Sequence, residues 1–326
     1  MAKRKLVFGC ALYDRMVPLA MGQVKPEGFD LEFAAIDDPR VTFDKMGKSL
    51  AFDASEMSSA EFIVRMSAGD CPFVAIPAFV SRVFRHGFIV VNRKAGIHTP
   101  KDLEGKRVGV PLYTMTAAVW IRGHLQHEYD VDLGRIRWIQ GSVNSAGKHG
   151  SPFALPLPKP PPVEINASGA TLSDMLAASE LDAIAGAILP DSLGKNPDVV
   201  RLFPDYQKVE MDYYRRTRIF PIMHLVVIRR DIYEETPAVA RSLYDALCES
   251  KRIALAGMRF VGATRYMLPW MAAEIEQLDG LFGADPWPYG IRNNRPTLEA
   301  MVQYLWEQSM LWKPLKVEDL FVPDIE

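Results

Sequence analysis

The sequence lacks the features that mark several large classes of protein. No apolar run approaches the ~18 residues that a membrane-spanning helix needs, so we expect no membrane partner. Its three cysteines, Cys10, Cys71 and Cys248, are odd in number and widely spaced, which argues against a disulfide framework and suits a reducing compartment. The net charge of −2 gives no long-range attraction for nucleic acid. We therefore expect a cytoplasmic protein whose partner is a small molecule.

The common cofactor and hydrolase motifs are also missing. We find no GxGxxG, no GxxxxGK[ST] and no GxSxG, so nucleotide binding and serine-hydrolase chemistry have no local support. His124 and His127 form an HxxH on an expected helix, but no glutamate lies between them and no cysteine pair has zinc spacing. A solvated helix face explains these histidines better than a metal pair. The sequence therefore predicts neither a metal nor a cofactor.

The chain does contain a long alternation of strands and helices. Its 326 residues are 48% hydrophobic and 24% charged, which suits a two-lobed protein with real cores. Strands separated by helices predict an α/β fold, with a mixed, mostly parallel sheet flanked by helices in each lobe. The expected strands are 5–11, 31–36, 71–76, 88–91, 106–110, 136–139, 163–165 and 183–187.

The strand pattern also predicts where the chain passes between the lobes. It restarts at Lys106, and the apolar run Phe220–Ile228 is too long for a surface loop, so we interpret it as a returning strand. We predict one lobe from residues 1–95 with 226–326 and a second from 96–225, with the substrate cleft between them. The Ser-, Gly- and Pro-rich segment 141–162 is typical of an extended insertion that covers such a cleft.

Three further segments carry local predictions. Residues 51–54 are expected to form a loop, and 55–58 to cap a helix over 60–68 with their serines. Residues 237–273 are expected to be helical, and 298–311 to form an amphipathic helix.

The region after the expected strand 106–110 suggests a site for an anion. Tyr113, Thr114 and Thr116 open a helical pattern, and a helix start presents free N–H groups and a positive dipole end, which bind carboxylates. A plain N-cap without a ligand explains the threonines equally well.

Charged and polar residues follow the ends of several other expected strands. Ligands in open α/β sheets bind beyond the carboxyl ends of strands, so these side chains are expected to converge. They are Asp14, Arg15, Ser55, Glu56, Arg82, Arg85, His86 and His224.

The order and spacing of short strings along nearly the whole chain resemble the 4,5-dihydroxyphthalate decarboxylase family. The strings are Tyr13–Arg15, Phe52–Ser58, Ser81–His86, Gly109–Gly123, Phe220–His224, Asp285–Gly290 and Asn294–Arg295. The resemblance implies a type II periplasmic-binding-protein-like fold that stays in the cytoplasm and decarboxylates a hydroxylated aromatic acid without a cofactor. The most direct expectation is conversion of 4,5-dihydroxyphthalate to 3,4-dihydroxybenzoate.

This chemistry assigns expected roles to the converging side chains. A phthalate-like substrate carries two carboxylates, which the planar guanidinium of arginine binds bidentately, so Arg82 and Arg85 are the expected anchors, with Arg15 and Arg295 behind them. His86 or His224 is the expected proton donor, and Glu56 is expected instead to hold the phenol or to act as the acid if burial raises its pKa. The remaining expected contacts to the substrate are Asp14, Ser55, Tyr113, Thr114 and Thr116.

A second class of function stays open on the sequence. The fold more often serves a binding protein that closes on a small anion without chemistry. The histidines and glutamate among the arginines favour an enzyme. Release of CO2 from hydroxylated benzoates and phthalates discriminates between the two.

Overall fold

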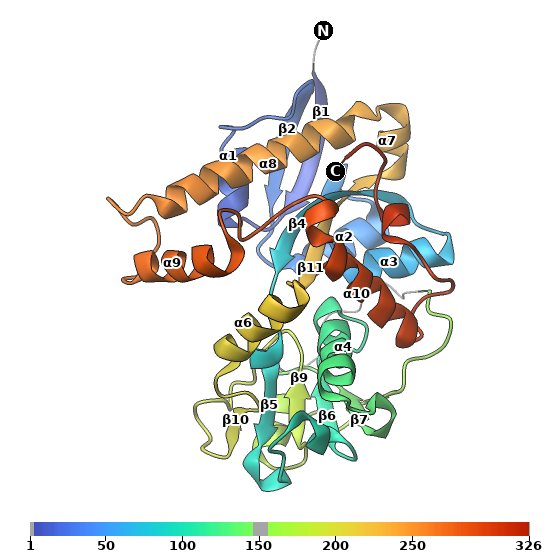
Figure 1. The fold of residues 1–326 in the computed structure, drawn as a ribbon. Helices are drawn as coiled ribbons and strands as arrows, with labels where there is room; N and C mark the ends of the chain where they lie inside the picture. The colour runs from blue at the N-terminus through green and yellow to red at the C-terminus, as the bar shows by residue number, and fades with distance from the viewer. Residues whose placement is uncertain (1–2, 146–155, 326) are drawn as a thin grey trace.

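The computed structural model describes residues 3–145 and 156–325 and contains two mixed β-sheets with helices packed on them (Figure 1). The first sheet has the order β2-β1-β3-β11-β4. Its strands are β1 (Arg4–Cys10), β2 (Phe29–Ala35), β3 (Ala54–Ser58), β4 (Phe73–Arg82) and β11 (Ile222–Arg229). Strand β1 pairs in parallel with β2 and β3, whereas β11 runs antiparallel to both β3 and β4. The expected returning strand is therefore an internal strand of this sheet.

The second sheet has the order β10-β5-β9-β6-β7-β8. Its strands are β5 (Ile89–Asn92), β6 (Arg107–Val110), β7 (Arg137–Gln140), β8 (Val163–Ile165), β9 (Ala183–Ala185) and β10 (Val199–Arg201). The pairs from β9 through β6 and β7 to β8 are parallel, and β5 is antiparallel to both of its neighbours. The two sheets confirm the expected α/β fold. Of the expected insertion over 141–162, residues 146–155 lie outside the described part of the chain.

The chain changes sheet earlier than the sequence suggested. Strand β4 ends the first pass at Arg82, and β5 already belongs to the second sheet. The return occurs between β10 and β11. The runs 89–92 and 222–229 are strands within a sheet because both are almost fully buried and their backbone groups pair on both sides. The division at residues 95 and 225 itself stays a prediction.

Strand β3 is the main local difference from the sequence prediction, which had a loop and a cap at this position. All five of its residues are buried, including Ser55 and Glu56. Pairing with β1 and β11 satisfies the backbone and places these polar side chains inside the first sheet. The capping role falls to Ser58 alone, whose Oγ accepts from the N–H of Glu61 at 3.4 Å.

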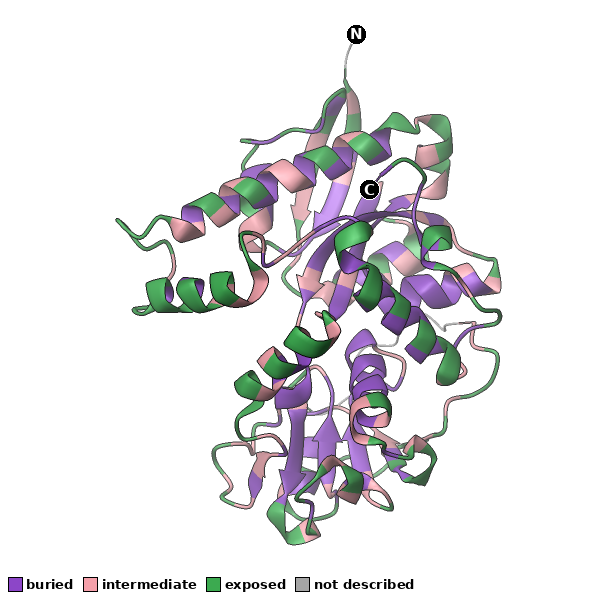
Figure 2. Cartoon of the chain, viewed as in Figure 1, coloured by how far each residue is buried: buried purple, intermediate pink, exposed green. Residues whose placement is uncertain are grey.

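Helices cover both sheets, and Figure 2 shows their exposed sides turned away from the buried strands. They are α1 (Val17–Ala20), α2 (Pro39–Ser49), α3 (Ser59–Ala68), α4 (Thr116–Tyr129), α5 (Leu172–Ala177), α6 (Tyr206–Thr217), α7 (Arg230–Glu235), α8 (Ala238–Arg259), α9 (Met271–Phe282) and α10 (Arg295–Glu307). The expected helix over 237–273 ends at Arg259, and α9 begins after a turn-rich segment. In the described part of the chain, no helix is both long and apolar enough to span a bilayer.

Helix α4 follows a strand of the second sheet but packs into the core of the first. Ala117, Val119 and Trp120 belong to the apolar cluster of the first sheet, and the Trp120 Nε1–H donates to the Ile222 carbonyl at 3.0 Å. A Cβ at Gly123 would lie 2.0 Å from the Tyr304 ring, so only glycine permits this approach to α10. Helix α4 therefore ties the two sheets together at the edge of the cavity described below.

Candidate functional site

A cavity of about 300 Å³ lies between the first sheet and the segments of the second sheet that face it. The first sheet and its helices contribute the start of α2, the β3–α3 junction, the end of β4 and the start of β11. The second contributes residues 112–117 before and within α4, and residues 187–188 after β9. Its position fits a ligand held between the two halves of the fold.

Three helix N-termini meet at this cavity. Asp38 is the N-cap of α2, Ser58 is the N-cap of α3, and Thr116 begins α4, and all three residues line the cavity. The first N–H groups of a helix have no partner within the helix, and the helix dipole adds partial positive charge there. These helix starts favour an anion in the cavity, and binding of an anion at the start of α4 stays a prediction.

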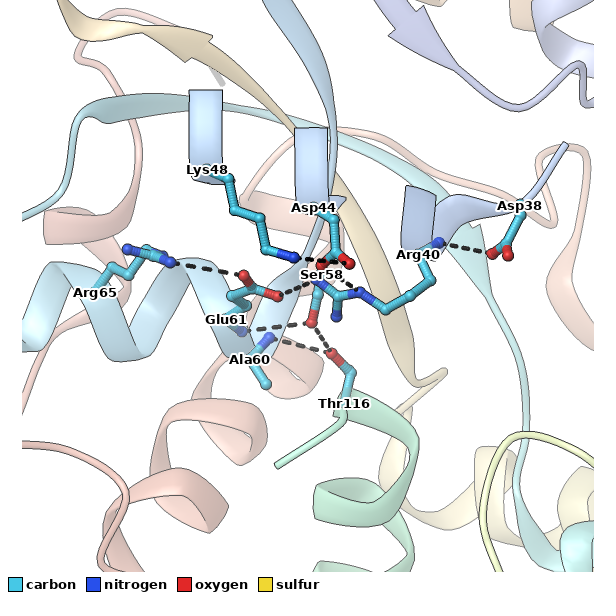
Figure 3. Close-up of polar contacts among 9 residues, drawn as sticks. All are labelled: Asp38, Arg40, Asp44, Lys48, Ser58, Ala60, Glu61, Arg65 and Thr116. Carbon is cyan, nitrogen blue, oxygen red and sulfur yellow. Dashed lines mark hydrogen bonds and ion pairs between the residues drawn. The ribbon is translucent and has the colours of Figure 1, made fainter. Parts of the chain in front are cut away.

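Thr116 does not cap its own helix, although it is one of the expected anion contacts. The N-cap of α4 is Met115, which makes no side-chain capping bond. The Oγ1 of Thr116 instead lies 2.9 Å from Oγ of Ser58 and accepts from the N–H of Ala60 at 3.2 Å, as Figure 3 shows. Thr116 thus joins the starts of α3 and α4, while Thr114 lines the cavity beside it.

Arg85 is the cation of the cavity with the fewest partners. Among the residues that the structure describes, its guanidinium donates one hydrogen bond, to Sδ of Met223 at 2.9 Å, and forms no ion pair. Burial lowers its pKa to about 10, against a weaker opposing effect of Glu210. A buried guanidinium without a carboxylate is costly, and a carboxylate ligand offsets that cost.

His224 lines the same cavity and is held from behind by Glu56. Its Nδ1 lies 3.2 Å from Oε2 of Glu56, which also accepts from the Tyr13 hydroxyl at 3.0 Å. The other oxygen of Glu56 accepts from the Ala11 N–H at 2.8 Å. Because the carboxylate occupies Nδ1, Nε2 is the ring nitrogen left for a substrate.

Apolar side chains complete the space between these polar groups. The ring of Phe43 packs edge-on against His224, with 4.8 Å between ring centroids. Leu112, Met115 and Ile188 line the cavity from the second sheet. This combination suits a flat aromatic ring that carries acidic groups.

The sequence analysis missed a charged network at the starts of α2 and α3 (Figure 3). Arg40 donates to Asp44 at 2.9 Å and to Oε2 of Glu61 at 3.2 Å, and both Arg40 and Glu61 line the cavity. Two signals in the sequence mark these residues. Asp38–Pro39 is a strong helix start, and Ser58 with Glu61 matches the capping-box pattern.

The structure places Arg82 apart from the cavity. Its guanidinium donates to the carbonyls of Phe220 at 3.1 Å and Pro288 at 2.8 Å, and also to Oδ1 of Asn294. Burial lowers its pKa to about 9. These contacts fix the segments where the chain leaves and re-enters the first sheet.

His86 lies in an aromatic cluster and does not line the cavity. Its ring stacks on His124 with 5.0 Å between centroids, and Tyr213 and Phe203 pack around it. Burial lowers its pKa to about 4. This environment keeps the ring neutral at ordinary pH.

The other expected contacts are also held elsewhere. Asp14 and Arg15 pair at 3.0 Å and line a different, mostly apolar cavity of about 300 Å³ under α8 and α9. Ser55 is fully buried within the sheet, and Tyr113 is buried against the Arg122 guanidinium. Arg295 forms a surface ion pair with Glu318 at 2.7 Å. Of the expected residues, Arg85, Thr114, Thr116 and His224 line the cavity, and Glu56 lies behind them in contact with His224.

No metal-binding group stands out in the described ranges 3–145 and 156–325. There, no cluster of three or more His, Cys, Asp or Glu side chains has the arrangement to hold a metal ion.

Comparisons with known proteins agree with this geometry. No family model matches the chain. It is 33% identical over 324 residues to a 4,5-dihydroxyphthalate decarboxylase of Comamonas testosteroni, covering 99% of this chain and 98% of that protein. A 4,5-dihydroxyphthalate decarboxylase of Pseudomonas putida is 35% identical over 216 residues, which are 66% of this chain and 83% of that protein.

Solved structures with low sequence identity share the fold. The periplasmic aliphatic sulphonate-binding protein SsuA of Escherichia coli matches with a TM-score of 0.55 at 11% identity, over 99% of both chains. A Candida albicans protein with the generic periplasmic binding protein fold matches with a TM-score of 0.51 at 13% identity, over 99% of this chain and 96% of that one. With its binding-protein fold and its full-length likeness to the Comamonas protein, the chain belongs to the 4,5-dihydroxyphthalate decarboxylase family.

Proposed function

We propose that this protein removes one carboxylate from 4,5-dihydroxyphthalate as CO2 and releases 3,4-dihydroxybenzoate. One observation carries the proposal. A cavity between the two sheets combines the buried guanidinium of Arg85, which forms no ion pair with the described residues, with His224, a histidine held by the buried carboxylate of Glu56. The family of the chain supplies the substrate.

The substrate is a dianion, and the cavity has matching groups. Arg85 binds one carboxylate, and the N–H groups at the start of α4 bind a carboxylate as well, because both are under-bonded donors in a partly dry cavity. The ring lies against Phe43 and Leu112. Arg82 is not an anchor in this proposal, because protein carbonyls already occupy its guanidinium.

His224 is the proton donor in this proposal. The ring carbon that bears the departing carboxylate takes the proton from Nε2, and the C–C bond then breaks so that its electrons return to the ring. Glu56 stabilises the imidazolium and fixes its orientation through Nδ1. His86 is the weaker candidate because its aromatic surroundings oppose protonation.

We further propose a cytoplasmic location, which the three unpaired cysteines support because free thiols suit a reducing compartment.

The test is incubation of the purified chain with 4,5-dihydroxyphthalate, phthalate and monohydroxybenzoates, with CO2 and the aromatic product measured together. We expect equimolar CO2 and 3,4-dihydroxybenzoate from the first compound and none from phthalate. Tight binding of the dianion without CO2 release would show that the protein is a binding protein for small aromatic anions and not an enzyme.

A further inference from the structure

The cavity contains a buried carboxylate that the binding of a dianion does not explain. Glu61 lines the cavity and is 3% exposed. The other lining carboxylate, Asp38, is exposed and caps α2 through Oδ1, which accepts from the Arg40 N–H. A negative charge here repels substrate carboxylates, so its presence in an anion site calls for a separate role.

Glu61 has few hydrogen bonds for a buried carboxylate. Oε2 accepts one, from Arg40 at 3.2 Å, and keeps a second lone pair. Oε1 is buried against the Arg65 guanidinium, 3.8 Å away, and accepts no hydrogen bond from the described residues. The second lone pair of Oε2 is therefore the acceptor left for a hydroxyl in the cavity.

Hydrogen bonds fix Glu61 where the starts of α3 and α4 meet. Its own N–H donates to Oγ of Ser58, which contacts Thr116 at the start of α4 (Figure 3). Arg40, held by Asp44, fixes the other end of the side chain. Glu61 is thus placed by three elements, α2, α3 and α4.

We propose that Glu61 is a second catalytic residue, whose carboxylate accepts the proton of the substrate hydroxyl para to the departing carboxylate. This inference rests on the decarboxylation proposed above. As the O–H proton moves to Glu61, the oxygen becomes a carbonyl and its electron pair moves through the ring to the carbon that takes the proton of His224. The C–C bond then breaks, its electrons restore the aromatic ring, CO2 leaves, and Glu61 returns its proton to the oxygen. The net reaction consumes one proton, which the solvent restores to His224.

The surroundings of Glu61 suit this exchange. Burial raises the pKa of Glu61, although Arg40 and Arg65 oppose the effect. A raised pKa of the carboxyl lies closer to the pKa of a phenol. Proton transfer between the two groups therefore costs less free energy in either direction.

The first test compares turnover of Glu61→Gln with that of Asp44→Asn. Both variants remove one carboxylate from Arg40, but Asp44 does not line the cavity. We expect CO2 release from 4,5-dihydroxyphthalate to fall at least ~100-fold in Glu61→Gln and to fall much less in Asp44→Asn, which loosens Arg40 but leaves the Glu61 carboxylate in place. Equal losses in the two variants, or near wild-type turnover in Glu61→Gln, would overturn the proposal.

A second variant controls for the possibility that Glu61→Gln fails to fold. Glu61→Asp keeps the charge near Arg40 but withdraws the carboxylate by one methylene. We expect it to unfold near the wild-type temperature and to turn over slowly. A folded Glu61→Asp protein with full turnover would contradict a direct contact with the substrate.

The second test needs no turnover and so separates this inference from the proposed reaction. 3,4-Dihydroxybenzoate and 4-hydroxybenzoate differ by the hydroxyl that Glu61 is expected to contact. By titration calorimetry we expect the wild type to prefer the dihydroxy acid about tenfold, as a hydrogen bond to a charged group implies, and Glu61→Gln alone to lose most of that preference. An unchanged preference in Glu61→Gln would show that Glu61 does not contact this hydroxyl. A wild type that shows the preference but releases no CO2 would instead refute the decarboxylation.

Discussion

His224 and Glu56 contact each other diagonally across the antiparallel pair β11 and β3, with Nδ1 3.2 Å from Oε2. His224 is in register with Ser58, so Glu56 is its diagonal neighbour, two residues along β3. Glu56 is fully buried, whereas the His224 side chain is 18% exposed. The pair therefore holds a histidine at the cavity from a position that solvent does not reach.

The first prediction separates catalysis from binding at this pair. We expect His224→Gln to lower turnover of 4,5-dihydroxyphthalate by ~100-fold or more with little change in phthalate affinity, because glutamine keeps a polar group but cannot supply the proton. Glu56→Gln should also slow turnover, since it removes the negative charge that stabilises the imidazolium of His224. His127→Gln is the matched control, because His127 is on the surface of α4 and bonds to Glu307. Full turnover in His224→Gln with a large loss in His86→Gln would move the donor role to His86.

The second prediction contrasts two buried arginines of similar sequence context. Arg85→Ala should weaken phthalate binding by on the order of 2–4 kcal/mol, because it removes the under-bonded cation of the cavity. Arg82→Ala should mainly lower the free energy of unfolding, because it leaves the carbonyls of Phe220 and Pro288 without their donor. Calorimetric titration and denaturant unfolding of both variants measure the two effects. Loss of affinity in Arg82→Ala at unchanged stability would restore Arg82 as an anchor.

A third prediction concerns the hydroxyl of Thr116. Thr116→Val keeps the shape of the side chain but deprives Ser58 Oγ and the Ala60 N–H of their partner. We expect the free energy of unfolding to fall by about 1–3 kcal/mol, the cost of unsatisfied buried polar groups. Thr116→Ser keeps the hydroxyl and should retain most of the stability. If the two variants unfold alike in urea, these hydrogen bonds do not stabilise the junction.

The fourth prediction tests the contact of α4 with α10. Alanine normally stabilises a helix relative to glycine by ~1 kcal/mol. Here the new Cβ would lie 2.0 Å from the Tyr304 ring, so Gly123→Ala should instead destabilise the protein. Gly280→Ala is a control on α9, because nothing lies within 4 Å of its added Cβ. Thermal unfolding should show opposite shifts, and a stabilised Gly123→Ala protein would contradict the tight approach.

The fifth prediction is a pH dependence of stability from His86. Its pKa is about 4 in the folded protein, below the ordinary value of 6.5, so the unfolded chain binds a proton that the folded protein does not. The contribution is therefore fully present above about pH 6.5 and is lost as the pH falls through 4. Glu210 acts in the opposite sense, because burial raises its pKa to about 6.

Comparison with His86→Leu measures the contribution of His86 together with its interaction with Glu210, 3.9 Å from Nδ1, because Glu210 itself is present in both proteins. Wild type should lose on the order of 3 kcal/mol more unfolding free energy than the variant between about pH 7 and pH 4. Burial lowers the pKa of the stacked His124 and His86 lowers it further, so the measured difference includes the effect of His86 on His124. Parallel pH profiles from denaturant unfolding would show that His86 does not titrate with a lowered pKa.

The strand pattern and the helix starts could be predicted from the sequence because they depend on local spacing. The alternation of apolar runs with helical segments gave the α/β class, and proline after Asp38 or glutamate after Ser58 mark helix starts without knowledge of the fold. Strand β3 was missed because Ala54–Ser58 is short and polar, and only pairing with β1 and β11 makes it a strand.

The sequence by itself determined which chemical groups are present, and the tertiary structure decided which of them meet. Arg82 and Arg85 are three residues apart, yet one is bound by protein carbonyls and the other lies at the cavity, because the strand ends between them. His86 and His224 are equivalent as amino acids, but packing buries one among aromatic rings and sets the other on Glu56. Burial and partners depend on contacts between residues distant in the sequence, which local patterns do not encode.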